Sequence, residues 1–231
     1  MISTTSHEKR RITALIHSMG ARRVLEIGAF RGETTRVMAD AVRERAGRVV
    51  VIDPMRWSSE VFRNGIARHL PAPLARLVTR LEQWSEIASY EPAFWSTVGG
   101  KERSDVLLYR ALSNDRALIA REDPELHEFD VVFIDGDHRY EGALSDLVNW
   151  GRRVRPGGLV LVHDATSRFP GVMRAIREWS TAPDVEVTWP DRDSLCVLRV
   201  GSASGAVTSA SDARQEPPPE TLLSDAEATG K

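Results

Sequence analysis

Short apolar runs alternate along the chain with segments in which apolar residues recur every three or four positions. A strand that is buried on both faces reads as a continuous run of valine, isoleucine and leucine, so each run predicts a strand. The expected strands are 24–27, 49–52, 106–109, 131–134 and 159–162. Spacings of three and four residues place apolar side chains on one face of a helix. The expected helices are 7–19, 34–42, one from about Asn114, 144–154 and 172–179.

Strands that alternate with helices indicate βαβ units, and hence an α/β fold built on a parallel sheet. A turn is predicted at 155–158, before the fifth strand, where two glycines follow a proline. Two further apolar runs, 185–189 and 195–200, predict a closing β-hairpin. The pattern therefore predicts a single domain over residues 1–200.

Two segments depart from this alternation. Residues 54–105 are long for a simple crossover and contain three tryptophans, with helix-like pieces around 58–70 and 74–89. We interpret them as a crossover helix with an insertion, whose aromatic residues either complete the core or an oligomer contact, or form a lid over a substrate pocket. Residues 201–231 lack aromatic residues and cannot bury enough apolar surface to offset their ordering entropy, so we expect a disordered tail.

Composition narrows the function further. The 231 residues carry a formal net charge of −2, so no overall field favours nucleic acid or a membrane. No apolar run approaches the roughly 18 residues of a membrane helix, and residues 1–11 lack the apolar core of a signal peptide. Cys196 is the single cysteine and can form no internal disulfide. We therefore expect a cytoplasmic protein whose partner is a small molecule.

Titratable side chains follow two of the predicted strands at the point where each strand ends. Asp135, Asp137 and His138 come directly after 131–134, and His163 and Asp164 come directly after 159–162. In open α/β sheets, ligands bind just outside the carboxyl ends of the strands. These side chains predict a metal site, an acid–base site, or both. Asp137 is interpreted instead as a cap of the following helix.

A glycine-containing loop, Gly28-Ala29-Phe30-Arg31-Gly32-Glu33-Thr34, connects the first strand to a helix, which is the context of a nucleotide-type ligand. Asp53, at the end of the next strand, can accept hydrogen bonds from both hydroxyls of a ribose. A dinucleotide requires G-x-G-x-x-G, so that bare backbone can approach the pyrophosphate. Here Phe30 replaces the middle glycine, which favours S-adenosylmethionine because that cofactor has no phosphate.

These motifs resemble those of class I S-adenosylmethionine-dependent methyltransferases, over about residues 20–200. The first motif of that family is similar to residues 24–32, and Asp53 matches its ribose-binding acid. The stretch 133–142, with His163-Asp164 and 169–172, resembles the bacterial small-molecule O-methyltransferases that include sugar methyltransferases and cephalosporin-hydroxylase-like proteins. The resemblance implies a Rossmann-like, mostly parallel sheet of seven strands, helices on both faces, and an antiparallel last strand.

The strand ends also resemble those of catechol-type O-methyltransferases, which implies a divalent metal, Mg²⁺ or another ion. Asp135 matches the first metal ligand of that group, and His163 and Asp164 fall at the second and third. His163 replaces a carboxylate, which weakens the case for magnesium and points to a softer ion. The catalytic base of that group lies three residues after the first ligand, at His138. The acid often seen near the adenine falls near Leu112, which leaves Ser113 as the polar contact.

The resulting hypothesis is an O-methyltransferase that acts on a hydroxyl of a small metabolite, such as a sugar or natural product. Either His138 or His163 serves as the base, and a metal held by Asp135 and Asp164 would assist. For Glu26, a water-mediated cofactor contact and a structural hydrogen bond are both open. The residues expected to bind the cofactor are Glu26, Gly28, Ala29, Phe30, Gly32, Thr34, Asp53, Ser113 and Asp135. The alternatives are a carboxyl or N-methyltransferase, an NAD-dependent oxidoreductase, and a catalytically silent binding protein. A homo-oligomer is compatible with each.

Overall fold

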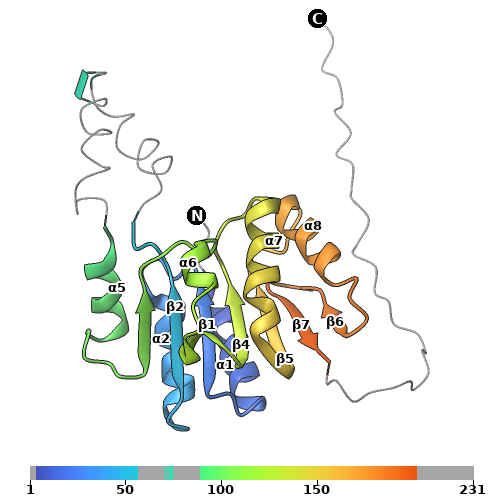
Figure 1. Ribbon diagram of the computed structural model, residues 1–231, viewed down its shortest axis with the longest axis horizontal. Coiled ribbons are helices and arrows are strands. Elements are labelled where there is room, and N and C mark those ends of the chain that lie inside the picture. The colour runs from blue at the N-terminus through green and yellow to red at the C-terminus, as the bar shows by residue number, and fades with distance from the viewer. Residues whose placement is uncertain (1–3, 57–70, 72, 75–88, 202–231) are drawn as a thin grey trace, which may run out of the picture.

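The structure is a computed structural model that describes residues 4–56, 71, 73, 74 and 89–201. Within these residues the chain forms a seven-stranded sheet in the order β3-β2-β1-β4-β5-β7-β6 (Figure 1). Strands β1 to β5 run parallel, and β7 pairs antiparallel with both β5 and β6. The expected Rossmann-like sheet with an antiparallel last strand is confirmed. The strands are β1 (Arg23–Ile27), β2 (Arg48–Ile52), β3 (Val106–Tyr109), β4 (Phe129–Ile134), β5 (Val154–Val162), β6 (Val185–Thr188) and β7 (Cys196–Val200).

Helices cover both faces of the sheet, because alternate strand residues point to opposite faces and both sets are apolar. One core cluster packs Leu25 and its neighbours against the buried faces of α6, α7 and α8. The other packs Val24 and its neighbours against α1, α2 and α5. The helices are α1 (Ser6–Ser18), α2 (Glu33–Arg43), α5 (Glu91–Val98), α6 (Arg116–Ile119), α7 (Tyr140–Asn149) and α8 (Pro170–Trp179), with 3₁₀ turns at Pro124–Leu126 and Gly151–Arg153. No helix within the described ranges is both long enough and apolar enough to cross a bilayer.

The prediction of a helix over 144–154 is wrong at its end. Helix α7 stops at Asn149, and the guanidinium of Arg153 then donates to the carbonyls of Ile119 and Leu126, which holds a short 3₁₀ turn. Val154 already belongs to β5, where it pairs with Phe129.

The predicted turn at 155–158 lies within β5 rather than before it. Val154 pairs with Phe129 and Leu159 pairs with Val131, so these residues face the single residue Asp130 as a bulge. Arg155 donates to the Asp130 carboxylate at 2.5 Å, which holds the bulge against the neighbouring strand.

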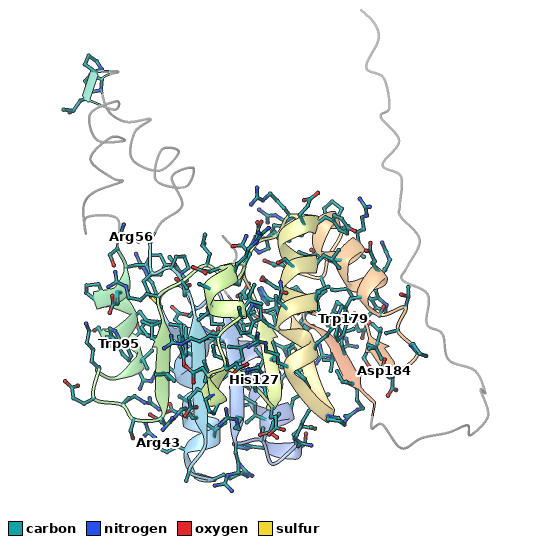
Figure 2. The ribbon with its side chains drawn as sticks, in the orientation of Figure 1. Arg43, Arg56, Trp95, His127, Trp179 and Asp184 are labelled. Atoms are coloured by element: carbon teal, nitrogen blue, oxygen red, sulfur yellow. The ribbon has the colours of Figure 1, made fainter. Side chains whose placement is uncertain are left out.

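Helix α5 is the crossover between β2 and β3. Its Phe94 and Val98 are buried in the core, while Trp95 is partly buried and donates through its indole N–H to Glu91 (Figure 2). In this part of 54–105 the aromatic residues therefore complete the core. The predicted helical pieces at 58–70 and 74–89 lie almost entirely outside the described residues. The tail beyond residue 201 lies outside them as well.

Helix α1 is attached to the sheet through Glu8, a buried glutamate at the third position of a capping box. One of its oxygens accepts from the backbone N–H and hydroxyl of Thr5, at 2.7 and 2.8 Å. The other accepts from the N–H and hydroxyl of Ser194, before β7, at 2.9 and 2.6 Å. Burial pushes the pKa of Glu8 upwards, but the hydrogen bonds from Ser194 and Thr5 outweigh it and set the pKa at about 2. Glu8 thus carries a charge that joins α1 to the residues just before β7.

The loop after β1 comes close to β4 at Gly28, a position that only glycine fits. Gly28 has φ +82°, and a Cβ there would lie 2.3 Å from the carbonyl oxygen of Asp135. Gly28 N–H donates to the carbonyl of Ile52, and Asp135 N–H donates to that of Ile27. The carboxyl ends of β1, β2 and β4 are therefore held together by backbone contacts.

Gly28→Ala should destabilise the protein more than Gly157→Ala, although both glycines have φ +82°. Nothing lies within 4 Å of a Cβ at Gly157. That substitution should cost only the left-handed conformation, about 1 kcal/mol. Gly28→Ala adds an overpacking clash with backbone, so we expect about 3 kcal/mol. Urea unfolding of both variants measures the difference; equal losses would contradict the close approach of β1 and β4.

Glu8→Gln should lower the free energy of unfolding at pH 7 by about 3 kcal/mol, because it removes one charge of a buried network. The folded-state pKa lies below the ordinary 4.5, so this stabilisation is complete above pH 4.5 and is lost as the pH falls towards 2. The gap between wild type and variant should therefore shrink between pH 7 and pH 3. The control is Glu33→Gln, which removes an exposed ion pair with Lys9 and should cost under about 1 kcal/mol. A gap that stays constant with pH would argue against the charge of Glu8.

Candidate active site

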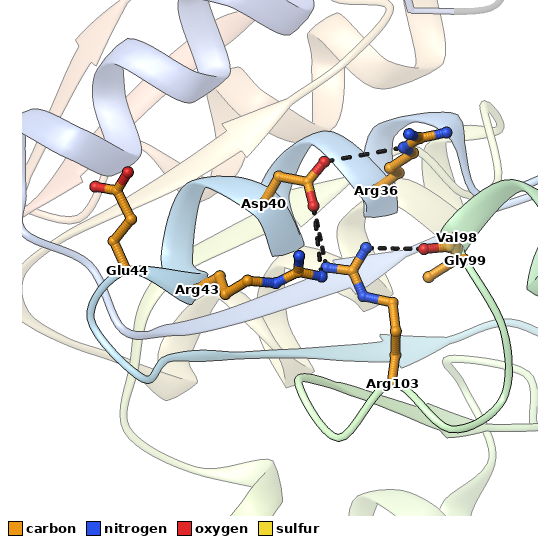
Figure 3. A pocket seen from close by; sticks show the side chains of 7 residues that line it. All are labelled: Arg36, Asp40, Arg43, Glu44, Val98, Gly99 and Arg103. Atoms are coloured by element: carbon orange, nitrogen blue, oxygen red, sulfur yellow. Dashed lines mark hydrogen bonds and ion pairs between the residues drawn. The ribbon is translucent and has the colours of Figure 1, made fainter.

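One hollow on the described surface lies away from the carboxyl ends of β4 and β5. Figure 3 shows it between α2 and the end of α5. Asp40 and Arg103 meet there at 3.1 Å, and Arg103 also pairs with Asp105 at 2.7 Å. These charged side chains are paired with one another across neighbouring elements. The hollow is therefore not a convincing substrate site. The chemistry-bearing side chains gather instead at the carboxyl ends of β1, β2, β4 and β5.

Asp53, after β2, is bound to the glycine loop. One carboxylate oxygen accepts from the N–H groups of Ala29 and Phe30, at 2.9 and 3.1 Å. The other accepts from the N–H of Met55 at 2.6 Å and from the hydroxyl of Tyr90 at 2.7 Å. Burial and the neighbouring carboxylate raise the pKa of the Tyr90 hydroxyl far above its usual value, so it stays a donor. No sequence pattern pointed to Tyr90.

The glycine loop is shaped by left-handed residues and leads into α2. Phe30 has φ +48°, and its ring packs edge-on against Tyr90 with centroids 5.2 Å apart. Gly32 is the N-cap of α2, and Thr34 in the first turn donates to the hydroxyl of Thr4 at 3.1 Å. The loop and Asp53 therefore form one hydrogen-bonded unit, and their binding of the cofactor stays a prediction.

Glu26 lies in the middle of the sheet and is fully buried. It accepts a short hydrogen bond from the hydroxyl of Thr35, on α2, so the structural hydrogen bond foreseen for this residue is present. Its Oε1 has no partner among the described groups. Burial raises the pKa of Glu26 to about 8. The negative charges of Asp135 and Asp53 also raise it, and the hydrogen bond from Thr35 lowers it. Because Oε1 has no partner within the described part of the chain, it could contact the cofactor, and this contact stays a prediction.

His138, after β4, faces Asp164, after β5. Its Nε2 lies 2.8 Å from Oδ2 of Asp164, and about a third of its side chain, 33 %, is exposed. The imidazole stacks on Phe169 with centroids 4.5 Å apart, which fixes the ring plane. Burial acts to raise the pKa of Asp164, but hydrogen bonds from His138 and His163 outweigh it and hold the carboxyl ionised. The interpretation of Asp137 as a cap of the following helix is wrong, because Arg139 is the N-cap of α7 and no side chain caps it; Asp137 accepts from the N–H of Arg139 instead.

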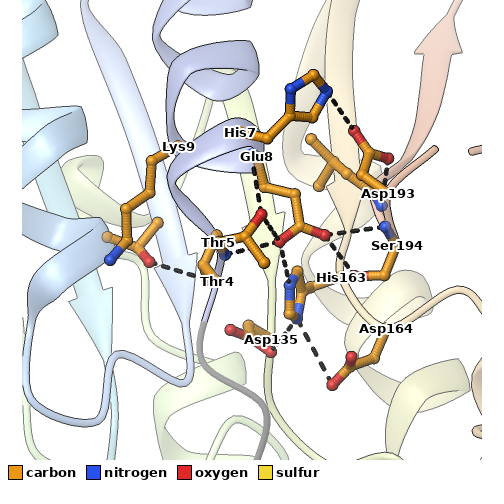
Figure 4. A network of polar contacts seen from close by, with 12 residues as sticks. Thr4, Thr5, His7, Glu8, Lys9, Asp135, His163, Asp164, Asp193 and Ser194 are labelled. Atoms are coloured by element: carbon orange, nitrogen blue, oxygen red, sulfur yellow. Dashed lines mark hydrogen bonds and ion pairs between the residues drawn. The ribbon is translucent and has the colours of Figure 1, made fainter.

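His163 is fully buried between three carboxylates, as Figure 4 shows. Its Nδ1 lies 3.1 Å from Asp135 Oδ1 and 3.5 Å from Asp164 Oδ2, and its Nε2 lies 3.4 Å from Glu8 Oε2. Burial lowers the pKa of this imidazole, but hydrogen bonds to Asp135 and Asp164 outweigh it and raise the pKa to about 11. His163 is therefore a fixed positive charge inside the site.

Glu8 is a functional-site neighbour that sequence reasoning missed. The pattern Thr5-x-x-Glu8 is a capping-box signal and indicates only the start of a helix. That its carboxylate reaches His163 depends on how α1 packs across the sheet, which no local pattern records.

Asp135, His138 and Asp164 each offer a ligand atom, and these atoms lie within 4.8 Å of one another. Asp135 and Asp164 are also among the metal ligands predicted from the sequence. The third member is His138 instead of the predicted His163. Both ring nitrogens of His163 face carboxylates. Two carboxylates and one imidazole fit a divalent ion softer than Mg²⁺, which prefers oxygen alone.

Ser113 lies apart from this cluster, in the loop after β3. Its carbonyl accepts from the indole N–H of Trp150 at 2.8 Å. The carboxyl of Asp146, on α7, is its other polar neighbour. Leu112, at the position where the family resemblance implies an acid, is largely exposed, at 59 %.

Comparison with known proteins supports the same family. A family model described as a methyltransferase domain matches residues 25–165. The O-methyltransferase from Bacillus cereus in complex with SAH is similar with a TM-score of 0.58 and 18 % identity, over 86 % of this chain and 82 % of that chain. A putative O-methyltransferase from Klebsiella pneumoniae gives 0.56 and 19 %, over 87 % and 82 %.

A third solved structure is TomG from Streptomyces achromogenes, an O-methyltransferase involved in tomaymycin synthesis and solved with SAM. Its TM-score is 0.52 at 17 % identity, over 87 % of this chain and 82 % of that chain. At these identities the structural likeness shows the fold, which agrees with the strand order described above. Because the family model spans well over half of the chain, this protein belongs to the methyltransferase domain family, as the sequence motifs indicated.

Proposed function

We propose that this protein transfers a methyl group from S-adenosylmethionine to a hydroxyl group of a small molecule, with His138 as the base. The observation that carries the proposal is the His138–Asp164 pair, 2.8 Å apart at the carboxyl ends of β4 and β5. It lies on the same edge of the sheet as the loop of Gly28 and Asp53. The family match supports methyl transfer and argues against the NAD-dependent alternative.

His138 fits the role of base better than His163 does. A base must reach the acceptor and hold a free lone pair. His163 has no exposed surface, and carboxylates face both of its nitrogens. His138 is partly exposed, and with its Nε2 proton directed at Asp164 its Nδ1 holds the lone pair.

Methyl transfer is an in-line displacement at the sulfonium methyl. The acceptor oxygen forms a bond to the methyl carbon as the carbon–sulfur bond breaks, and the electron pair stays on sulfur. The hydroxyl proton passes to Nδ1 of His138, and the charged imidazole is stabilised by Asp164. The stacking of His138 on Phe169 keeps the ring oriented, so alignment is achieved before the acceptor arrives.

A divalent ion would be held by Asp135, Asp164 and His138. Such an ion supplies an electrophile that orients the acceptor oxygen and lowers its pKa. His138 would then be a ligand instead of the base, so metal assistance and base catalysis by His138 are alternatives for this site.

The acceptor class is proposed from one comparison and from the His138–Asp164 pair. TomG takes part in tomaymycin synthesis, which supports a natural product here, and a sugar acceptor stays a prediction from the sequence. A carboxylate acceptor would need no base, and the His138–Asp164 pair argues for an alcohol or phenol. A cytoplasmic location and a homo-oligomer stay predictions.

The wild-type protein should bind S-adenosylhomocysteine with micromolar affinity, about −8 kcal/mol, and should not bind NAD. Isothermal titration calorimetry with each ligand, in a divalent ion and again in EDTA, measures this. Mn²⁺ and Mg²⁺ should be compared separately, because the donor set favours the softer ion. Binding of NAD, or no binding of S-adenosylhomocysteine, would refute the proposed function. An affinity that differs between the Mn²⁺ and EDTA runs would support a metal linked to the site.

His138→Ala should reduce kcat by about 10²- to 10⁴-fold, the usual contribution of a general base, with S-adenosylhomocysteine affinity unchanged. Turnover is followed as S-adenosylhomocysteine release with a panel of phenols and sugars in EDTA. His17→Ala, an exposed histidine at the end of α1, is the control and should keep full activity. A His138→Ala variant as active as His17→Ala would remove His138 from the mechanism.

A further inference from the structure

Arg168 is an exposed arginine after β5 that the proposed reaction does not use. It makes no hydrogen bond or ion pair with any residue that the structure describes. Two other arginines at the same edge of the sheet do have acidic partners. Arg110 pairs with Glu91 at 3.2 Å. Arg139 pairs with Asp137 at 2.5 Å. Arg168 therefore keeps a positive charge that a ligand can use.

A single phenyl ring connects this cation to the candidate base. The guanidinium carbon of Arg168 lies 5.7 Å from the centroid of the Phe169 ring, within the range of a cation–π contact. The same ring stacks on the imidazole of His138, with centroids 4.5 Å apart and an angle of 26° between the planes. The cation and the base are therefore neighbours of one aromatic ring.

Backbone contacts hold this segment in place. The N–H of Phe169 donates to the carbonyl of Thr166 at 2.9 Å, and the N–H of Thr166 donates to the carbonyl of Asp164 at 2.8 Å. A Cβ at Gly171 would lie 2.8 Å from the carbonyl oxygen of His138, so the start of α8 lies directly against the loop after β4. An ordered turn thus presents Arg168 beside the base, and a ligand that binds there need not order the backbone.

The strand order places Arg168 on the side of the methyl acceptor. Strand β4 lies between β1 and β5, so the loop of His138 separates the glycine loop from Arg168 (Figure 1). The methyl donor is proposed to lie at the glycine loop and Asp53, on the far side of His138. A molecule that approaches His138 from the side of β5 therefore meets Arg168.

The charges around His138 separate two ends of such a molecule. Asp135 and Asp164 offer carboxylate oxygens within 4.8 Å of the ligand atom of His138, and like charges repel. An anionic group is therefore disfavoured next to the carboxylates and favoured at the cation. The acceptor that fits this arrangement has a neutral hydroxyl at one end, at His138, and an anion at the other, at Arg168.

We propose that Arg168 binds a carboxylate of the methyl acceptor, so that the substrate is a small hydroxy acid methylated on its hydroxyl. The planar fork of a guanidinium matches a carboxylate with two parallel hydrogen bonds. This carboxylate orients the acceptor and forms no bond to the methyl group. The inference rests on the proposed function and names the substrate class of the same site.

The test measures the binding of matched acid and neutral ligands to the full chain saturated with S-adenosylhomocysteine. The pairs are 4-hydroxybenzoate with 4-hydroxybenzamide, and glucuronate with glucuronamide; each pair keeps its hydroxyl groups and differs in the anion. NMR titration gives the dissociation constants without turnover. In at least one pair the acid should bind about fivefold or more tightly than its amide, because only the acid can form a charge-assisted pair. In Arg168→Gln the same preference should fall below about twofold.

The matched control is Arg177→Gln. Arg177 is an exposed arginine later in α8 whose guanidinium carbon lies 5.5 Å from the centroid of the Trp189 ring, so it makes the same kind of contact away from His138. This variant should keep the wild-type preference. Thermal unfolding should be the same for both variants, because both side chains are exposed.

The proposal is overturned if the acid preference is smaller than this in both pairs, if Arg168→Gln keeps it, or if Arg177→Gln loses it equally. A protein that binds S-adenosylhomocysteine but neither acid overturns this inference alone. A protein that does not bind S-adenosylhomocysteine refutes the proposed function instead.

Discussion

The site depends on one steric constraint, the contact between the backbone of Gly28 and that of Asp135. No side chain fits there, since a Cβ would lie 2.3 Å from the Asp135 carbonyl oxygen. The contact holds the loop after β1 against the end of β4. It thereby brings the groups that are proposed to hold the cofactor to the same edge as His138 and Asp164. Parallel strands alone would bring these loops to one edge, but not into contact.

Charge at this edge is arranged as an alternating network. Glu8, Asp135 and Asp164 surround His163, so carboxyl groups from α1 and from the residues after β4 and β5 meet at one buried imidazole. Because removing one partner leaves another buried charge without compensation, such networks hold their members in a fixed geometry. Helix α1 lies before the segment matched by the methyltransferase family model, yet it takes part in the site. The hairpin residue Ser194 joins the same network through Glu8.

The sequence allowed the sheet and its functional edge to be predicted, because both depend on local signals. Continuous apolar runs marked the five parallel strands, and Asp and His residues directly after them marked the site. Val154 was assigned to a helix because its spacing continues that of Leu144 and Leu147, whereas pairing with Phe129 decides its conformation. Glu8 and Tyr90 carried no signal, since their contacts join segments far apart in the chain. The choice between His138 and His163 was likewise open, because burial and not residue type separates them.

Backbone conformation shows what the site demands of the fold. Phe30, Met55 and Asp164 follow β1, β2 and β5, and all three have positive φ without being glycine, at +48°, +55° and +57°. Each left-handed residue of this kind costs about 1–2 kcal/mol that glycine would avoid. A chain selected only for folding would place glycine at these positions. Keeping a phenyl ring, a thioether and a carboxylate there lowers the margin of stability at one edge of the sheet, which makes that edge the natural place for a bound ligand to stabilise the whole domain.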